Sequence, residues 1–84
     1  MAMAKMYTTG WCPDCRRAKQ FLSARGVSVE EINIDESPDD EDLVMSVNHG
    51  RRKVPTFEVD GKFFACSPFD PHLLAEKFGV PLNP

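Results

Sequence analysis

Residues 7–15 read Tyr7-Thr8-Thr9-Gly10-Trp11-Cys12-Pro13-Asp14-Cys15 and place two cysteines three positions apart. A strand-like run precedes this stretch and an amphipathic run follows it, so the cysteines fall where a predicted strand leads into a predicted helix. The first amides of a helix lack partners within the helix, and its dipole is positive at that end. This position favours a thiolate at Cys12. One turn later, Cys15 falls on the apolar face, where we expect a more buried and protonated thiol.

The elements on either side of this stretch form a βαβ unit. Residues about 3–8 are predicted to be a strand, and the helical pattern runs from Pro13 to just before Gly26. Residues about 27–34 alternate like a second strand. This order predicts two parallel strands joined by a right-handed crossover. Cys12 would then lie at the carboxyl end of the first strand, where ligands collect in open α/β sheets.

The second half of the chain is predicted to contribute a helix, a hairpin and a last helix. Ser37-Pro38 suits a helix start with the serine as its cap, and Asn48-His49-Gly50 ends that helix. Asp60-Gly61 separates two apolar runs, which is a strong hairpin signal. Residues about 70–78 form the last helix. We therefore expect a single α/β domain over residues 1–84, ordered βαβ–ββα, with a four-stranded mixed sheet flanked by three helices.

The composition excludes several classes of protein. The chain has 84 residues, of which 42 % are apolar, and its net charge of −3 argues against a nucleic-acid binder. No apolar stretch is long enough to span a membrane. The first six residues lack the pattern of a secretory signal, and three cysteines suit no disulfide-stapled scaffold. We expect a cytoplasmic protein whose close cysteine pair is catalytic or metal-binding.

The chain as a whole, from about residue 3 to 78, resembles the glutaredoxins, small members of the thioredoxin superfamily. A Cys-x-x-Cys motif alone is only moderately specific. Here a Val-Pro pair follows it about forty residues later, with a hairpin directly after, and the combination is strong. The matching residues are Tyr7-Thr8, Trp11-Cys12-Pro13-Asp14-Cys15, Arg17-Ala18-Lys19, Gly26-Val27-Ser28 and Val54-Pro55.

The resemblance implies a thioredoxin-like (glutaredoxin) fold and a dithiol–disulfide oxidoreductase acting on protein or glutathione mixed disulfides. Cys12 would attack the disulfide and Cys15 would resolve the mixed disulfide. Val54-Pro55 would be cis and would pack opposite the dithiol, with the backbone of Val54 pairing with an extended substrate. The sequence alone gives no reason to expect a cis bond, and its simpler interpretation is a proline that starts an edge strand.

Further substrate contacts are expected next to these residues. Trp11 would flank the sulfur of Cys12 as an apolar contact surface. Its simpler interpretation is a half-buried packing residue, and the two interpretations are compatible. Pro13 and Ser67 are expected to touch the substrate, and Arg51 in the basic run 51–53 is expected to bind a carboxylate.

Two departures from the family pattern bear on the electron donor. Glutathione-using glutaredoxins commonly carry a lysine where Thr9 stands, and a Gly-Gly pair followed by an acid where this chain has Ala65-Cys66-Ser67-Pro68. The segment 67–71 looks more like the redoxins that serve ribonucleotide reductase and take electrons from thioredoxin reductase. No bound cofactor is expected, and either glutathione or thioredoxin reductase would supply electrons. Expected partners of this monomer are disulfide-containing proteins or glutathione, with ribonucleotide reductase among the candidates.

Two other functions compete with this interpretation. An iron–sulfur or zinc carrier would use the same thiolates, but one Cys-x-x-Cys supplies two ligands where a closed site needs four. The remaining candidates, Cys66, His49 and His72, stand at no diagnostic spacing, so no metal site is predicted; the histidines are expected at the surface. Cys66 is expected to be a semi-buried core thiol, with a regulatory role as the alternative. An interaction module without redox activity would not need the paired cysteines.

Overall fold

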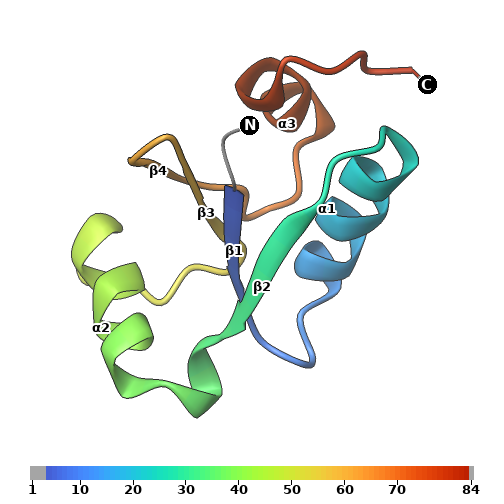
Figure 1. Cartoon of the computed structure of the whole chain (residues 1–84). Helices are drawn as coiled ribbons and strands as arrows, with labels where there is room; N and C mark the ends of the chain where they lie inside the picture. The colour runs from blue at the N-terminus through green and yellow to red at the C-terminus, as the bar shows by residue number, and fades with distance from the viewer. Residues whose placement is uncertain (1–3, 84) are drawn as a thin grey trace.

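The computed structural model describes residues 4–83 and contains all the predicted helices and strands (Figure 1). Met3, in the predicted first strand, lies outside the described residues. The short 3-10 helix η1 was not predicted. Among the described residues, no helix is long and apolar enough to cross a membrane. The elements are β1 (Ala4–Thr8), α1 (Pro13–Ala24), β2 (Val29–Asn33), η1 (Ile34–Glu36), α2 (Pro38–Val47), β3 (Thr56–Val59), β4 (Lys62–Ala65) and α3 (Pro71–Phe78).

The four strands form one mixed sheet in the order β2-β1-β3-β4. Strands β1 and β2 are parallel, with Tyr7 opposite Ile32, as the βαβ unit predicts. Strand β3 runs antiparallel to β1, with Met6 opposite Phe57, and β4 runs antiparallel to β3. Since β1 and β2 are parallel, the loop that follows β1 lies at the same end of the sheet as the end of β2 (Figure 1).

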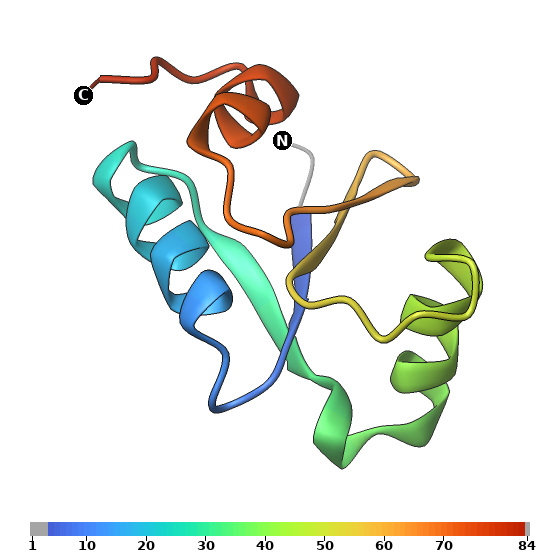
Figure 2. The same ribbon diagram turned by 180° about the vertical axis from the view of Figure 1, so that it is seen from behind.

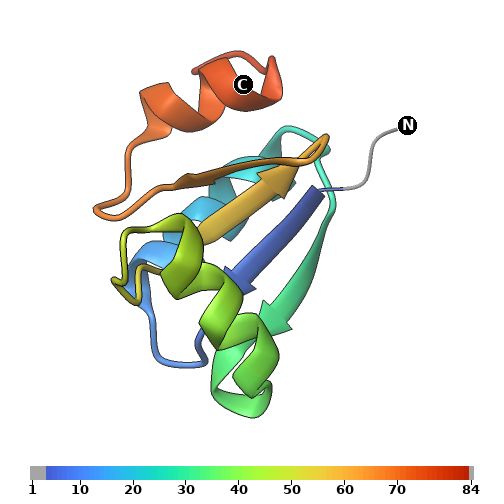
Figure 3. The same ribbon diagram turned by 90° about the vertical axis from the view of Figure 1, so that its left-hand side faces the viewer.

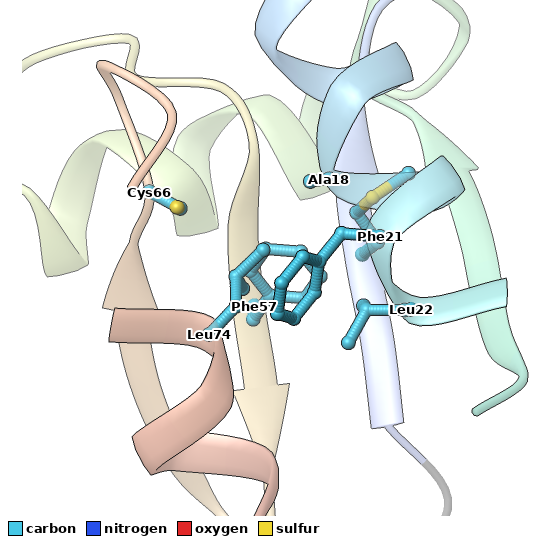
Figure 4. Close-up of a cluster of buried hydrophobic side chains, with 7 residues drawn as sticks. Ala18, Phe21, Leu22, Phe57, Cys66 and Leu74 are labelled. Atoms are coloured by element: carbon cyan, nitrogen blue, oxygen red, sulfur yellow. The ribbon is translucent and has the colours of Figure 1, made fainter. Parts of the chain in front are cut away.

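Helices cover both faces of the sheet. Successive strand residues point to opposite faces, so Met6 faces α1 and α3 while Tyr7 faces α2. Figure 2 shows α1 and α3 near each other with α2 apart, and Figure 3 looks onto the sheet, with α2 in front of it and α1 behind. The larger core cluster lies between the sheet and the α1–α3 pair (Figure 4). It consists of Met6, Ala18, Phe21, Leu22, Phe57, Cys66 and Leu74.

The helix starts follow the sequence signals with one correction. Asp70 caps α3 as an N-cap residue, because its Oδ1 accepts hydrogen bonds from the amides of His72 and Leu73 at 3.0 and 3.3 Å. Ser37 occupies the N-cap position of α2, but its hydroxyl caps no backbone amide. It donates a hydrogen bond to Asp40 Oδ2 in the first turn of α2, with an O···O distance of 2.7 Å.

The turn between β3 and β4 confirms the hairpin prediction. Asp60 and Gly61 have φ angles of 52° and 78°, so both lie in the left-handed region. A two-residue turn with this backbone matches the twist of the strands on either side. Glycine adopts such a φ without steric cost, which is why the Asp-Gly pair predicts this turn.

Candidate active site

Cys12 is the N-cap residue of α1 and lies just after β1 and its short loop. Its backbone is extended, with φ −81° and ψ 113°, and Pro13 fills the first helical position. The amide of Cys15 donates a hydrogen bond to Cys12 Sγ, with an N···S distance of 3.0 Å. The sulfur thus takes the place of a capping oxygen, and one amide serves it where the sequence suggested several. This amide and the positive end of α1 both favour a negatively charged sulfur.

Cys15 is the more shielded of the two thiols. Its residue exposure is 3 %, against 7 % for Cys12, and neither cysteine forms a disulfide in this structure. Burial, followed by the hydrogen bond with Cys12, raises the pKa of Cys15 from 9.0 to about 12. Cys15 is therefore protonated at neutral pH, in agreement with the sequence prediction.

The Val54-Pro55 segment lies next to Cys12. The Val54-Pro55 bond is cis, as the resemblance implied, and Cys12 Sγ lies 3.7 Å from the Val54 carbonyl oxygen, to which the thiol donates. The amide of Cys66 donates to the Pro55 carbonyl at 2.9 Å. The interpretation of Pro55 as the start of an edge strand is wrong, since the following strand β3 lies between β1 and β4.

Trp11 and Pro13 present exposed surface beside Cys12. Trp11 is 67 % exposed, so the interpretation as a half-buried packing residue is wrong. Pro13 is also exposed at the start of α1. A large exposed indole next to a reactive sulfur supplies apolar area for contact with a partner.

Arg51 and Ser67 lie in different surroundings. Arg51 is exposed and lines a separate hollow with Asn48 and Lys53, among others. It does not line the cavity that contains the cysteines. Ser67 precedes a second cis proline bond and follows Cys66, whose amide is bonded to the Pro55 carbonyl. The fold therefore brings Ser67 close to the cis-proline segment, and it does not bring Arg51 into the dithiol cavity.

A cavity of about 350 Å³ opens at the dithiol, and its other walls were not predicted from the sequence. Lys19 and Glu31 form an ion pair there, with 2.8 Å between Nζ and Oε2. The βαβ pattern of the sequence was the signal that could have predicted these walls, because a parallel crossover brings the end of β2 beside the loop after β1. The lining residues are Met6, Thr8, Thr9, Gly10, Cys12, Cys15, Arg16, Lys19, Glu31 and Asn33.

Cys66 is a core residue, more deeply buried than expected. It belongs to the cluster between the sheet and α1–α3, and burial raises the pKa of its thiol. Its Sγ accepts a hydrogen bond from the Asp70 amide at 3.2 Å. His49 and His72 are exposed, as predicted. Within residues 4–83, no three cysteine, histidine or acidic side chains gather into a group able to hold a metal ion.

Comparisons with known proteins agree with this architecture. Residues 4–64 match the family model described as glutaredoxin. Glutaredoxin 3 of Escherichia coli is 37 % identical over 62 residues, covering 74 % of each chain. Mycoredoxin 1 of Corynebacterium glutamicum is 32 % identical over 76 residues, covering 90 % of this chain and 94 % of the relative. The solved NrdH-redoxin of Escherichia coli has a TM-score of 0.75 at 23 % identity, covering 88 % and 92 % of the two chains, and this likeness concerns the fold alone.

Proposed function

Because this chain belongs to the glutaredoxin family of thiol–disulfide oxidoreductases, we propose that Cys12 is its nucleophile and Cys15 its resolving thiol. The observation that supports these roles best is the 3.0 Å hydrogen bond from the Cys15 amide to Cys12 Sγ at the start of α1. This bond stabilises a thiolate at Cys12 and fixes Cys15 one turn away. The spacing keeps the two sulfurs near enough to form a disulfide with little backbone movement.

The reaction transfers two electrons from the dithiol to the substrate. The Cys12 thiolate attacks one sulfur of a substrate disulfide, so a Cys12–substrate bond forms while the substrate disulfide breaks and releases one thiolate. The Cys15 sulfur, once deprotonated, attacks Cys12 Sγ. This second step forms the Cys12–Cys15 disulfide and releases the other half of the substrate as a thiolate.

The shielding of Cys15 fits its role in the second step. Burial is the largest cause of its raised pKa, and the hydrogen bond and the charge interaction with Cys12 add to it. Both effects of Cys12 on the pKa of Cys15 require the Cys12 sulfur to be a free thiol or thiolate. They disappear when that sulfur joins the substrate, so Cys15 becomes easier to ionise in the intermediate that it must attack.

Val54 offers the backbone contact for an extended substrate. Its carbonyl accepts from the Cys12 thiol at 3.7 Å in the protonated form. A thiolate has no proton to donate, so ionisation of Cys12 frees this carbonyl for a substrate amide. Trp11 and Pro13 would contact the substrate beside the Cys12 sulfur. Ser67, and then Arg51, would contact parts of the substrate that lie further from this sulfur.

The proposed electron donor is thioredoxin reductase rather than glutathione. Thr9 is uncharged and 4 % exposed at the position that lysine occupies in glutathione-using glutaredoxins, so it offers no cation to a carboxylate. The Gly-Gly pair of those proteins is also missing at Ala65-Cys66. NADPH oxidation should be faster with thioredoxin reductase than with glutathione plus glutathione reductase, and the reverse order would contradict this choice. Ribonucleotide reductase is one candidate for the disulfide substrate.

The catalytic roles are tested with serine variants of the two cysteines. We expect Cys12→Ser to abolish disulfide reduction, and Cys15→Ser to accumulate a mixed disulfide visible by mass spectrometry. Cys66→Ala serves as the matched control, because it removes a thiol that does not line the dithiol cavity. Disulfide reduction retained by a folded Cys12→Ser protein would contradict the proposal.

The alternative of an iron–sulfur or zinc carrier has less support, because Cys12 and Cys15 provide two of the four ligands that a closed site needs. Anaerobically purified protein should be colourless and free of zinc. A stoichiometric cluster or zinc ion that is lost in Cys12→Ser would favour the carrier instead.

A further inference from the structure

The loop between α2 and β3 carries the backbone proposed to pair with an extended substrate, and it has no regular structure of its own. It runs from Asn48 to Pro55 and is the yellow segment in Figure 1. Near its end, the carbonyl oxygen of Val54 lies 3.7 Å from Cys12 Sγ. The contacts that fix this loop therefore determine where the Val54 carbonyl lies relative to the reactive sulfur.

Neutral hydrogen bonds hold one side of the loop. The Thr56 hydroxyl donates to the Lys53 carbonyl at 2.8 Å and accepts from Asn48 Nδ2 at 3.0 Å. Thr56 is fully buried, so these bonds are shielded from water. They connect the loop to the start of β3 and to the carboxyl end of α2. None of these bonds reaches η1 or the amino end of α2.

Arg52 supplies that missing connection. Its guanidinium pairs with two carboxylates from two different elements, Nε with Glu41 Oε2 at 2.7 Å in the first turn of α2 and Nη2 with Asp35 Oδ1 in η1. The planar fork of an arginine holds two such acceptors in a fixed geometry. Because η1 directly follows β2, whose last residue Asn33 lines the dithiol cavity, Arg52 links the loop to the opposite wall of the site.

The neighbours of Arg52 in the basic run 51–53 behave differently. Arg51 and Lys53 form no ion pair within residues 4–83 and line the separate hollow instead. The Arg52 side chain is 31 % exposed, so its ion pairs contribute little to the stability of the whole domain. A loop without regular structure opens locally at a much smaller cost than the domain unfolds. The same two ion pairs can therefore govern the order of the loop.

We propose that Arg52 is a positioning residue that holds the Val54 backbone in place for extended disulfide substrates. Arg52 itself lies outside the lining of the dithiol cavity, and it acts only through the loop. This inference rests on the proposed function, because it concerns the Val54 contact of the same site. The thiol–disulfide exchange is unchanged, and Arg52 affects how tightly an extended substrate binds before it.

The test compares two uncharged disulfides in single turnover with pre-reduced full-length protein, followed by the fluorescence of Trp11. The first is a short end-blocked peptide without charged side chains, dimerised through its one cysteine. The second is hydroxyethyl disulfide, which has no peptide backbone. We expect Arg52→Gln to raise the half-saturating peptide concentration about fivefold, the effect of losing partly exposed ion pairs. The limiting rate with the peptide and the rate with hydroxyethyl disulfide should not change.

Substitutions of the two acids separate positioning from overall charge. Asp35→Asn and Glu41→Gln change the net charge in the direction opposite to Arg52→Gln, yet each should raise the half-saturating peptide concentration about twofold by removing one ion pair. Combining both with Arg52→Gln should add nothing further. Arg52→Lys should restore part of the binding, and Lys77→Gln on α3 is the charge-matched control that should leave it unchanged.

An unchanged half-saturating concentration in folded Arg52→Gln protein would overturn the positioning role and leave the oxidoreductase proposal intact. An increase in Arg52→Gln without any in Asp35→Asn and Glu41→Gln would also overturn it, because Arg52 would then contact the peptide directly. Equal slowing with both disulfides would assign a general structural role to Arg52 instead. A wild-type protein that reduces neither disulfide would overturn the proposed function itself.

Discussion

Raising the pH should destabilise this protein through the buried thiol of Cys15. The pKa of Cys15 is about 12 in the folded protein, against 9.0 for an ordinary thiol, with burial as the first cause. Above about pH 9 the unfolded chain loses this proton while the folded chain keeps it, so the stability present below pH 9 is lost as the pH rises towards 12. A gap of three pKa units corresponds to about 4 kcal/mol in total.

Cys15→Ala isolates this contribution. At neutral pH the variant should be less stable by about 1 kcal/mol, because it loses a small buried group. Tyr7 and Cys66 also have raised pKa values, but they titrate in both proteins and cancel in the difference. By about pH 10.5 the wild type should have lost about 2 kcal/mol more than the variant, which would make the two equally stable or reverse their order.

The assay is urea unfolding of both reduced proteins at several pH values between about 7 and 10.5, within the range where the linkage acts. Circular dichroism follows the transition, and a reductant prevents disulfide formation. A difference in unfolding free energy between the two proteins that stays constant across this range would contradict the prediction, because it would mean that Cys15 ionises alike in the folded and unfolded chains.

Three further substitutions probe the core, the hairpin and the exposed surface. Leu74→Ala should lower the free energy of unfolding by about 2–5 kcal/mol in urea titration, since Leu74 is fully buried; a loss under about 1 kcal/mol would contradict the described core. Gly61→Ala should cost about 1 kcal/mol, because its φ is 78°, and an unchanged urea midpoint would argue against the left-handed turn. Trp11→Ala should change stability by no more than about 0.5 kcal/mol yet slow the reduction of protein disulfides, and an unaltered rate would exclude Trp11 as a contact surface.

Much of the fold follows from local signals in the sequence. Asp60-Gly61 predicts its turn because few residues tolerate the left-handed backbone found there. Pro13 marks the start of α1 through its fixed backbone geometry, which needs no tertiary contacts. Cys12 and Cys15 could be placed at the start of a helix for the same reason. The cap that Asp70 provides for α3 was not predicted. The features predicted correctly are those decided within about one helical turn of sequence.

The remaining features depend on contacts between distant segments. Glu31 and Asn33 reach the dithiol cavity only because β2 pairs with β1, which spacing along the chain does not reveal. The sequence suggests that the Ser37 hydroxyl caps the helix. Only the folded geometry shows that this hydroxyl instead donates its hydrogen bond to Asp40. Among the described residues, the Thr9 hydroxyl is buried without a hydrogen-bond partner, which is likewise a property of packing that the sequence does not show.

The most direct test of the account is the order in which the three cysteines react with iodoacetamide in the native, reduced protein at neutral pH. Peptide mapping by mass spectrometry gives the rate for each. We expect Cys12 to be alkylated first and much faster than Cys15 or Cys66, because the start of α1 stabilises its thiolate while burial keeps the other two protonated. Alkylation of Cys15 or Cys66 as fast as Cys12 would contradict it.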